Sequence, residues 1–305
     1  MKFSGHETFP VREGWLHKGL KLVSEAPELF LDEEACDHLG VGKNMAKSIR
    51  HWLRVLDLAE PSGETTTGNH VLLRKTEFGE LVWEKDPFFL QAGTWWLLHV
   101  NLVNNRDSAS SWHWFFNSFR HDRFDRAVCL ESLGRYVERE QKRVPSAATL
   151  ARDLGCMLLS YARSIPSTND DPEDGADCPF RDLGLLSYYK TSGYYQLHQG
   201  VKDVPMEIFC YAMAKAFGET RGGADVRLHD VARTNGGPGR AFCLTEETLF
   251  ELVSHLETQD KKIEIVGIAG DRAVRTKVLS EIEWIKRFYD RVGQECHVEQ
   301  ESYAS

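Results

Sequence analysis

The chain has 305 residues, a formal net charge of −9, and 42% hydrophobic and 11% aromatic residues, which excludes a disordered polymer and allows two or three domains. No apolar run reaches the ~18–20 residues of a membrane span and no signal peptide precedes the first polar residues, so we expect no membrane partner. The seven cysteines form no C-x-x-C pair, which argues against a zinc ribbon or a secreted disulfide framework and favours the reducing cytoplasm.

The N-terminal arm gathers ionisable side chains ahead of the first expected helix. His6, Glu7 and Arg12 lie within the run Gly5–Lys18. An imidazole transfers protons near neutral pH, a glutamate can ligate Mg²⁺, and a guanidinium can neutralise charge that develops on a phosphate. These three residues are therefore the candidate catalytic residues, and Glu7 is the candidate metal ligand. The alternative, which we favour, is a buried network of the same three residues that fastens the arm, because ion-pair networks produce similar clusters.

Residues 28–83 have the pattern of a winged helix-turn-helix unit and lie in an expected N-terminal DNA-binding module, residues 1–86. A helix over Leu31–Leu39 is followed by the turn Gly40–Gly42 and by a second helix from Lys43 to about Leu58. A glycine-containing turn between two helices is typical of this motif, whose second helix enters the major groove. No carboxylate lies between Gly42 and Asp57, which favours DNA contact over an ordinary solvated face. The expected DNA-binding residues are Lys43, Asn44, Lys47, Arg50 and Arg54 on the second helix, and Arg74 and Lys75 on the wing.

Residues 87–165 are expected to form a helical middle domain. The aromatic segment from Trp112 to Phe119 predicts a buried core, because such side chains dominate core burial. Leu150, Leu154 and Met157 recur at helical spacing in a later helix. His121 and Asp122 follow the aromatic segment and form an alternative catalytic pair, although we favour an exposed loop between helices for them.

An acidic, proline-containing stretch separates the two halves of the chain. Residues 166–180 carry five carboxylates and no Lys or Arg, so we expect a linker or loop. Residues 181–305 then resemble a second winged-helix-like module, with a helix that Thr245 caps and a hairpin from Ile263 to Val278. Its third helix is acidic, so DNA contact and a purely architectural or protein-binding role stay equally open. The candidate DNA-binding residues of this module are Arg240, Arg272 and Arg275.

The predicted fold is mainly α with small β-hairpin wings, an α+β arrangement of two winged helix-turn-helix-like modules around a helical middle region. The sequence lacks a nucleophile elbow, an H-E-x-x-H motif and a G-x-x-x-x-G-K-[ST] loop, so no nucleotide cofactor is expected. These patterns predict binding to DNA, and nothing in the residues alone establishes hydrolysis.

Several blocks of the chain are similar to one bacterial family. They are Phe3–Phe9, Leu39–Met45, Trp95–His99, Trp112–Asn117, Cys178–Leu185 and Pro238–Leu244. The pattern resembles the SspB component of bacterial DNA phosphorothioation systems, in which sulfur replaces a backbone oxygen of one DNA strand. The resemblance covers most of the chain.

This resemblance implies a DNA-nicking subunit of a phosphorothioation and antiviral defence system. The expected partners are double-stranded DNA, a cysteine desulfurase, an ATPase and an ATP-pyrophosphatase-like sulfur transferase, and the expected cofactor is a divalent metal ion, Mg²⁺ or Mn²⁺. A homodimer is compatible with the sequence. The alternative function is a non-catalytic winged-helix DNA reader, either a specificity subunit or a transcription regulator.

Overall fold

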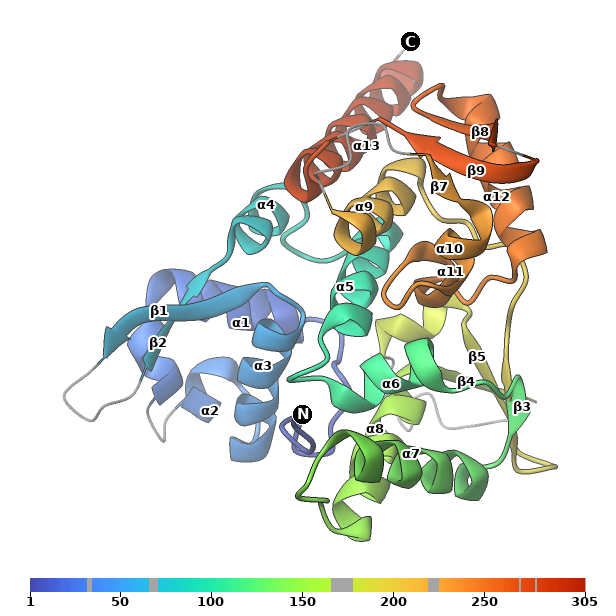
Figure 1. Ribbon diagram of the computed structural model, residues 1–305. Coiled ribbons are helices and arrows are strands. Elements are labelled where there is room, and N and C mark those ends of the chain that lie inside the picture. The colour runs from blue at the N-terminus through green and yellow to red at the C-terminus, as the bar shows by residue number, and fades with distance from the viewer. Residues whose placement is uncertain are drawn as a thin grey trace. The chain divides into compact units, whose positions relative to one another are not determined.

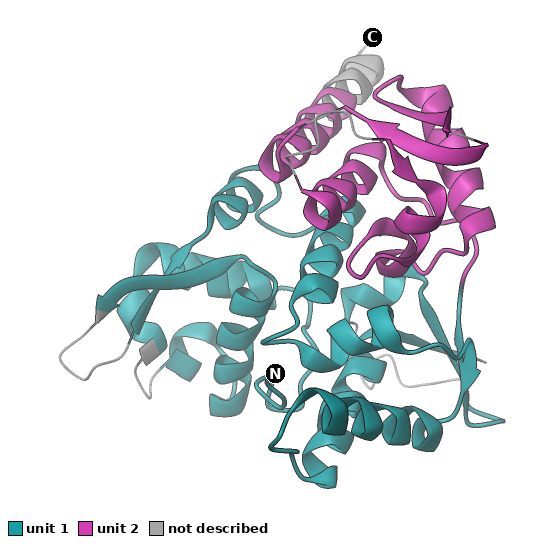
Figure 2. Cartoon of the chain, viewed as in Figure 1, with its two compact units in different colours: residues 1–198 teal, residues 199–305 magenta. Residues whose placement is uncertain are grey.

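The computed structural model describes residues 1–31, 35–65, 71–165, 178–218, 225–268, 270–277 and 279–304. The chain divides into two compact units, residues 1–198 and residues 199–305 (Figure 2). Both units are built mainly from helices with small sheets, which confirms the predicted α+β class. Among the described residues, no helix combines the length and the hydrophobicity that a membrane span requires.

The first part of unit 1, as far as it is described, places three α-helices and a short 3-10 helix ahead of a hairpin (Figure 1). Its elements are α1 (Trp15–Glu25), η1 (Pro27–Leu31), α2 (Ala35–Leu39), α3 (Lys43–Val55), β1 (Ala59–Thr65), β2 (Val71–Lys75) and α4 (Glu77–Lys85). Gly40 adopts φ +63° in the turn between α2 and α3, a conformation that glycine takes without a steric penalty. Of the predicted first helix, Leu31 belongs to η1, residues 32–34 lie outside the described residues and α2 covers the rest, while α3 ends at Val55 instead of Leu58. The order of helices and hairpin matches the predicted module, while its assignment as a winged helix-turn-helix stays a prediction.

The second part of unit 1 is a set of helices against a four-stranded sheet (Figure 1). The helices are α5 (Ala92–Asn104), α6 (Ser110–Ser118), α7 (Arg126–Glu140) and α8 (Ala147–Tyr161), with η2 (Pro179–Leu183). The strands are β3 (Arg123–Phe124), β4 (Ala162–Ile165), β5 (Leu186–Tyr189) and β6 (Tyr194–Leu197), in the order β3-β6-β5-β4. Only the β4–β5 pair is parallel.

The predicted aromatic core of this region is confirmed. Trp112, Trp114, Phe115 and Phe116 are all buried on α6. The edge-to-face contact of Phe116 with Tyr161, at 5.0 Å between ring centroids, joins α6 to α8. Aromatic pairs at this separation stabilise a core beyond the area that they bury.

Among its described residues, unit 2 combines five helices with a three-stranded sheet. Its helices are α9 (Met206–Phe217), α10 (Leu228–Arg233), α11 (Pro238–Ala241), α12 (Glu246–Gln259) and α13 (Glu281–Ala304), and its strands are β7 (Val226–Arg227), β8 (Ile263–Ile268) and β9 (Asp271–Thr276). Thr245 caps α12 as predicted, since its hydroxyl accepts from the amide of Thr248. The predicted hairpin is the antiparallel pair β8–β9.

Residues 181–198, which the sequence placed in the C-terminal module, belong to unit 1. β5 pairs with β4 and β6 pairs with β3, so these hairpin strands complete the sheet of the middle helices. The sequence could not show this, because strand pairing across a long intervening segment leaves no local pattern. Most of the predicted acidic linker, including its five carboxylates, lies outside the described residues.

Candidate active site and nucleic-acid interface

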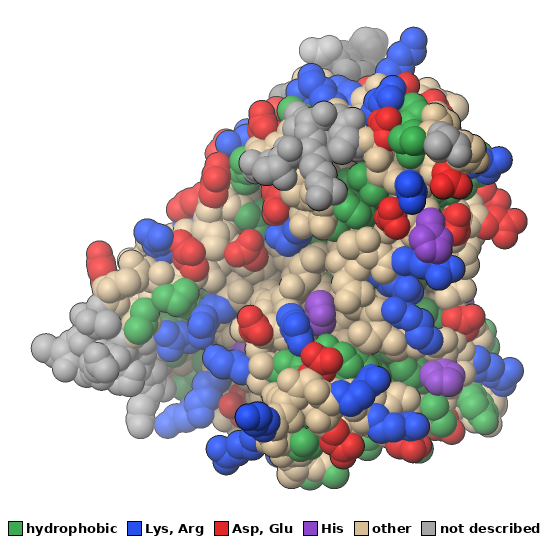
Figure 3. All heavy atoms as spheres, in the orientation of Figure 1, with side chains coloured by type: hydrophobic (Ala, Val, Ile, Leu, Met, Phe, Trp, Pro, Cys, Tyr) green, Lys and Arg blue, Asp and Glu red, His purple; other side chains and the backbone are tan. Residues whose placement is uncertain are grey.

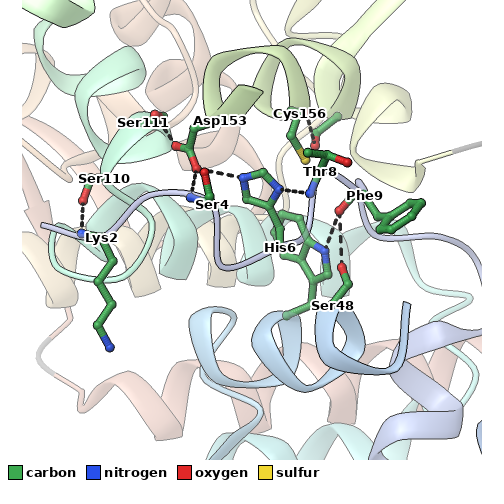
Figure 4. A network of polar contacts seen from close by, with 12 residues as sticks. Lys2, Ser4, His6, Thr8, Phe9, Ser48, Ser110, Ser111, Asp153 and Cys156 are labelled. Carbon is green, nitrogen blue, oxygen red and sulfur yellow. Dashed lines mark hydrogen bonds and ion pairs between the residues drawn. The ribbon is translucent and has the colours of Figure 1, made fainter. Parts of the chain in front are cut away.

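A buried histidine holds the N-terminal arm. His6 is 1% exposed, and its Nε2 atom lies 2.8 Å from Oδ1 of Asp153 on α8. The backbone amide of Thr8 donates to Nδ1 of the same ring at 3.1 Å. A ring nitrogen that accepts a hydrogen bond carries no proton, so Nε2 carries it and donates to Asp153. Figure 4 shows that both nitrogens of His6 are occupied by protein partners.

Asp153 joins the arm to two helices. Its Oδ1 atom also accepts from the backbone amide of Ser4 at 2.5 Å, and its Oδ2 atom accepts from the hydroxyl of Ser111 on α6 at 2.5 Å (Figure 4). Asp153 is 2% exposed, and a buried carboxylate is tolerated where hydrogen bonds replace its lost water. The network that fastens the arm therefore exists, but its members are Ser4, Ser111 and Asp153 in place of Glu7 and Arg12.

Aromatic side chains enclose the His6 ring. Trp112 lies edge-to-face at 5.5 Å between ring centroids, Trp52 is stacked at 6.3 Å, and His51 lies at 6.0 Å. Burial, and after it the neighbouring His6, lowers the pKa of His51 from about 6.5 to about 3. His51 is thus held neutral, as the apolar surroundings require.

Glu7, the residue after the buried His6, is not buried. Its side chain is exposed, and it sits in a turn where Ser4, Glu7 and Thr8 all have positive φ, at 66°, 49° and 70°. L residues with side chains adopt this region at a cost, and such strain persists only where surrounding contacts enforce it. The buried neighbour His6 provides those contacts, so the arm presents the carboxylate of Glu7 to solvent.

Arg12 is half-buried at the end of the arm. Its guanidinium lies over the rings of Phe9 and Trp15, at 5.9 and 5.5 Å from their centroids. Its Nε atom is buried and has no hydrogen-bond partner among the described residues. Arg12 therefore adds a positive charge that aromatic faces hold in place beside the arm.

The predicted basic face of α3 is present. Lys43, Asn44, Lys47 and Arg54 are exposed, while Ile49, Trp52 and Leu53 are buried on the other side of the helix. Arg50 is partly buried: it donates to the carbonyl of Val71 at 2.8 Å, and burial together with Arg54 lowers its pKa. Figure 3 shows Lys and Arg side chains gathered over the α2–α3 part of unit 1. This face offers several cations to a phosphate backbone.

The two cations of the hairpin are held by carboxylates. Arg74 pairs with Glu60 across β1 and β2 at 2.8 Å. Lys75 pairs with Glu80 at 2.8 Å, lies 5.4 Å from the ring centroid of Trp83, and has a side chain only 10% exposed. Lys75 is therefore poorly placed for a phosphate, whereas Arg74 is exposed and could exchange its partner.

The alternative pair, His121 and Asp122, is exposed as predicted. His121 helps to line a pocket of about 470 Å³ between α6 and α7, which Arg120, Arg135 and Arg139 share. Asp122 is absent from the lining of that pocket. The structure thus places His121 beside three arginines and one carboxylate, Glu138, and does not bring it together with Asp122 in this pocket.

The three arginines of unit 2 are engaged within that unit. Arg275 holds Asp225 with two nitrogens, at 2.7 and 2.9 Å, and also contacts Glu264 at 3.1 Å. Arg272 lies 4.2 Å above the ring of Phe250, and Arg240 donates to the carbonyl of Arg233 at 3.4 Å. Arg275 in particular has two carboxylate partners, which makes it an unfavourable phosphate ligand.

Within the described ranges, no three His, Cys, Asp or Glu side chains come together in an arrangement that holds a metal ion. Glu7 is therefore an exposed carboxylate that belongs to no such cluster within the part of the chain that the structure describes. Mg²⁺ often keeps several waters and takes one or two carboxylates together with substrate phosphates. Glu7 fits that limited role.

Asp153 is the residue that the sequence interpretation missed. It lies three residues after Leu150 and four before Met157, so it falls on the apolar stripe of α8. A carboxylate at such a position needs a buried partner, and this signal could have pointed to a distant histidine.

Comparisons with known proteins give a family, and solved structures that are similar to this chain. A family model described as a protein of unknown function (DUF4007) matches residues 3–289. An SspB crystal structure is 29% identical, with a TM-score of 0.83, and a magnesium ion-bound SspB crystal structure is 28% identical, with a TM-score of 0.84. Each similarity covers 95% of this chain and 88% of the other. Comparison with curated proteins gave no match.

Proposed function

Because the chain belongs to the DUF4007 family and is similar to SspB over nearly its whole length, we propose that it is the DNA-binding subunit of a bacterial DNA phosphorothioation and defence system. In this proposal the protein nicks one strand of duplex DNA by phosphodiester hydrolysis, which allows sulfur to be incorporated. The similarity to SspB across 95% of the chain is the observation that carries the proposal. The protein then acts in the cytoplasm beside a cysteine desulfurase, an ATPase and an ATP-pyrophosphatase-like sulfur transferase.

The exposed face of α3 supports the DNA-binding part of the proposal. Lys43, Lys47 and Arg54 project from one side of the helix, and the segment between Gly42 and Asp57 contains no carboxylate. Cations on one face neutralise phosphates and release counterions, which gives affinity without reading the sequence. Asn44 lies near the start of the helix, where contacts to base edges are usual in helix-turn-helix proteins.

The N-terminal arm supports the catalytic part. Glu7 would be one ligand of a divalent ion whose other ligands are waters and the scissile phosphate, and that ion would stabilise the negative charge of the transition state. Arg12 adds a fixed positive charge near the arm. His6 has no free ring nitrogen, so in this arrangement it positions the arm and transfers no proton.

A specific observation favours the alternative, a non-catalytic DNA reader that serves as specificity subunit or transcription regulator. The histidine of the arm is buried with both nitrogens bound, which leaves the exposed carboxylates Glu7 and Glu13 as the acidic groups of that segment. A reader would use the basic face of α3 and need no metal ion.

Supercoiled plasmid separates the two functions. Purified protein with Mg²⁺ or Mn²⁺ is expected to convert covalently closed plasmid to open circles, and a chelator is expected to stop the conversion. Salt-dependent binding to duplex DNA without open circles in any metal would favour the reader.

A further inference from the structure

The four-stranded sheet of unit 1 has a set of aromatic and basic residues on one face. The register places Tyr189 directly opposite Tyr194. Side chains alternate between the two faces of a sheet, so both tyrosines share a face with Arg123, Arg163 and Ile165 on the other two strands. Figure 1 shows β3, β4 and β5 of this sheet.

The opposite face of the sheet belongs to the core. Phe124 and Leu186 are buried there, and Phe124 is stacked on Tyr195 with 5.5 Å between ring centroids. By contrast, Tyr189 and Tyr194 are 36% and 39% exposed. Two aromatic rings are thus carried on a packed sheet while remaining accessible to solvent.

Basic residues lie on or beside the strands that carry these rings. The guanidinium of Arg123 lies 4.9 Å from the ring centroid of Tyr194, and Arg163 and Lys190 are exposed. None of the residues in β3, β4, β5 or β6 is Asp or Glu. His121, two residues before Arg123 in the chain, lines a pocket with Arg120, Arg135, Arg139 and Glu138.

We infer that this face, defined by Tyr189, Tyr194, Arg123 and Arg163, binds single-stranded DNA by stacking unpaired bases on the two tyrosines. Exposed aromatic rings within a positively charged surface are the combination that proteins use to bind single strands without sequence preference. In a duplex the faces of the bases are stacked on one another, so a stacking surface selects the open strand. Arg123 can remain on Tyr194 or turn to a phosphate beside the stacked base.

The inference deepens the proposed function and rests on it, because strand opening at a nick supplies the unpaired bases. The occupant is nucleic acid rather than a peptide, since the strands combine arginines with aromatic rings and contain no acid to attract a basic partner. The surface is also separate in sequence from α3, which faces duplex DNA in the proposal.

Fluorescence anisotropy of the full chain with a labelled single strand, and with the duplex of the same sequence, tests the inference. Tyr194→Ala and Tyr189→Ala are each expected to weaken single-strand binding about tenfold, as the loss of one stacked base predicts. Tyr194→Phe keeps the ring and is expected to retain affinity. Phe88→Ala removes an exposed ring outside this sheet and is the matched control.

Several outcomes overturn the inference. The inference is wrong if single-strand affinity is unchanged in both tyrosine-to-alanine variants. It is also wrong if the wild-type protein binds only the duplex, and this second result leaves the proposed function in place. Protein that binds neither form contradicts both the inference and the proposed function.

A second measurement needs no variant, so it tests the inference even if the alanine variants fail to fold. Wild-type protein is irradiated with a single strand that contains 5-bromouracil, and the cross-linked peptides are identified. Cross-links within residues 186–197 or at Arg123 support the inference, and cross-links confined to other segments overturn it.

Discussion

His6 and Asp153 are 147 residues apart in the sequence, yet their side chains share a buried hydrogen bond of 2.8 Å. Through this bond, and through the amide of Ser4 and the hydroxyl of Ser111, the N-terminal arm is joined to α6 and α8. The same arm contains three residues of positive φ, among them Glu7. We therefore regard the buried pair as the support that holds Glu7 at the surface.

Replacement of Asp153 by Ala is expected to destabilise the fold. The change leaves His6, Ser111 and the amide of Ser4 without their acceptor in a buried place, and we expect a loss of about 3 kcal/mol in the free energy of unfolding. Urea denaturation measures this loss. Glu13→Ala, which removes an exposed carboxylate from the same arm, is the control, and equal stability of the two variants would contradict the assigned role of Asp153.

The pKa of His51 predicts how stability depends on pH. The pKa of His51 is about 3 in the folded chain and about 6.5 in the unfolded chain, so between these pH values the unfolded chain binds a proton at His51 that the folded chain does not bind. Stability from this residue is present above about pH 6.5 and is lost progressively as the pH falls toward 3. Carboxylates also titrate at the low end, so the useful window is pH 5–7.

The comparison of wild type with His51→Phe isolates this effect. Thermal unfolding of the wild type is expected to shift to lower temperature between pH 7 and pH 5, and the variant is expected to show a smaller shift. Identical shifts in both proteins would contradict the assignment of the pH dependence to His51.

Gly5→Ala is expected to disturb the arm. A Cβ atom at this position would lie 2.5 Å from Nδ1 of His51, closer than real contacts allow, so the imidazole or the arm must move. We expect a loss of about 1–3 kcal/mol, measured by the same urea denaturation. At Gly134 in α7 a Cβ atom would meet no neighbour, so Gly134→Ala should be neutral or stabilising. Equal changes in the free energy of unfolding for Gly5→Ala and Gly134→Ala would contradict the predicted steric clash with His51.

Substitutions on α3 are expected to weaken binding to duplex DNA. Lys47→Ala and Arg54→Ala should each reduce the slope of log affinity against log salt by about one unit, as the loss of one phosphate contact predicts. Arg275→Ala is the matched control, because its guanidinium is held by Asp225 and Glu264. If Arg275→Ala lowered the salt slope and Lys47→Ala did not, the DNA-binding face would lie on unit 2 and not on α3.

Local patterns predicted the helices well and the long-range pairings poorly. The amphipathic spacing of α3 located its buried side, Ile49 and Trp52, and its exposed cations. The partner of His6 was missed, because a hydrogen bond between residues that are 147 positions apart leaves no periodic signal. The sheet was missed for the same reason, since β3 and β6 meet only when the chain returns from a distant segment. Arg275 was expected to be a DNA-binding cation because one partner, Asp225, lies 50 residues away, although the predicted hairpin already placed its other partner, Glu264, on the facing strand.

The most direct test of the central claim compares plasmid nicking by wild-type protein, Glu7→Gln and Glu13→Gln. Glu7 and Glu13 are both exposed carboxylates of the arm, but only Glu7 sits in the turn that His6 and Asp153 support. With Mg²⁺ or Mn²⁺, wild type and Glu13→Gln are expected to produce open circles at similar rates, while Glu7→Gln, with unchanged unfolding by urea, loses the activity at least about 100-fold. If Glu7→Gln formed open circles at the wild-type rate, Glu7 would not be the metal ligand. If none of the three proteins formed open circles in any metal, the protein would not be a nickase.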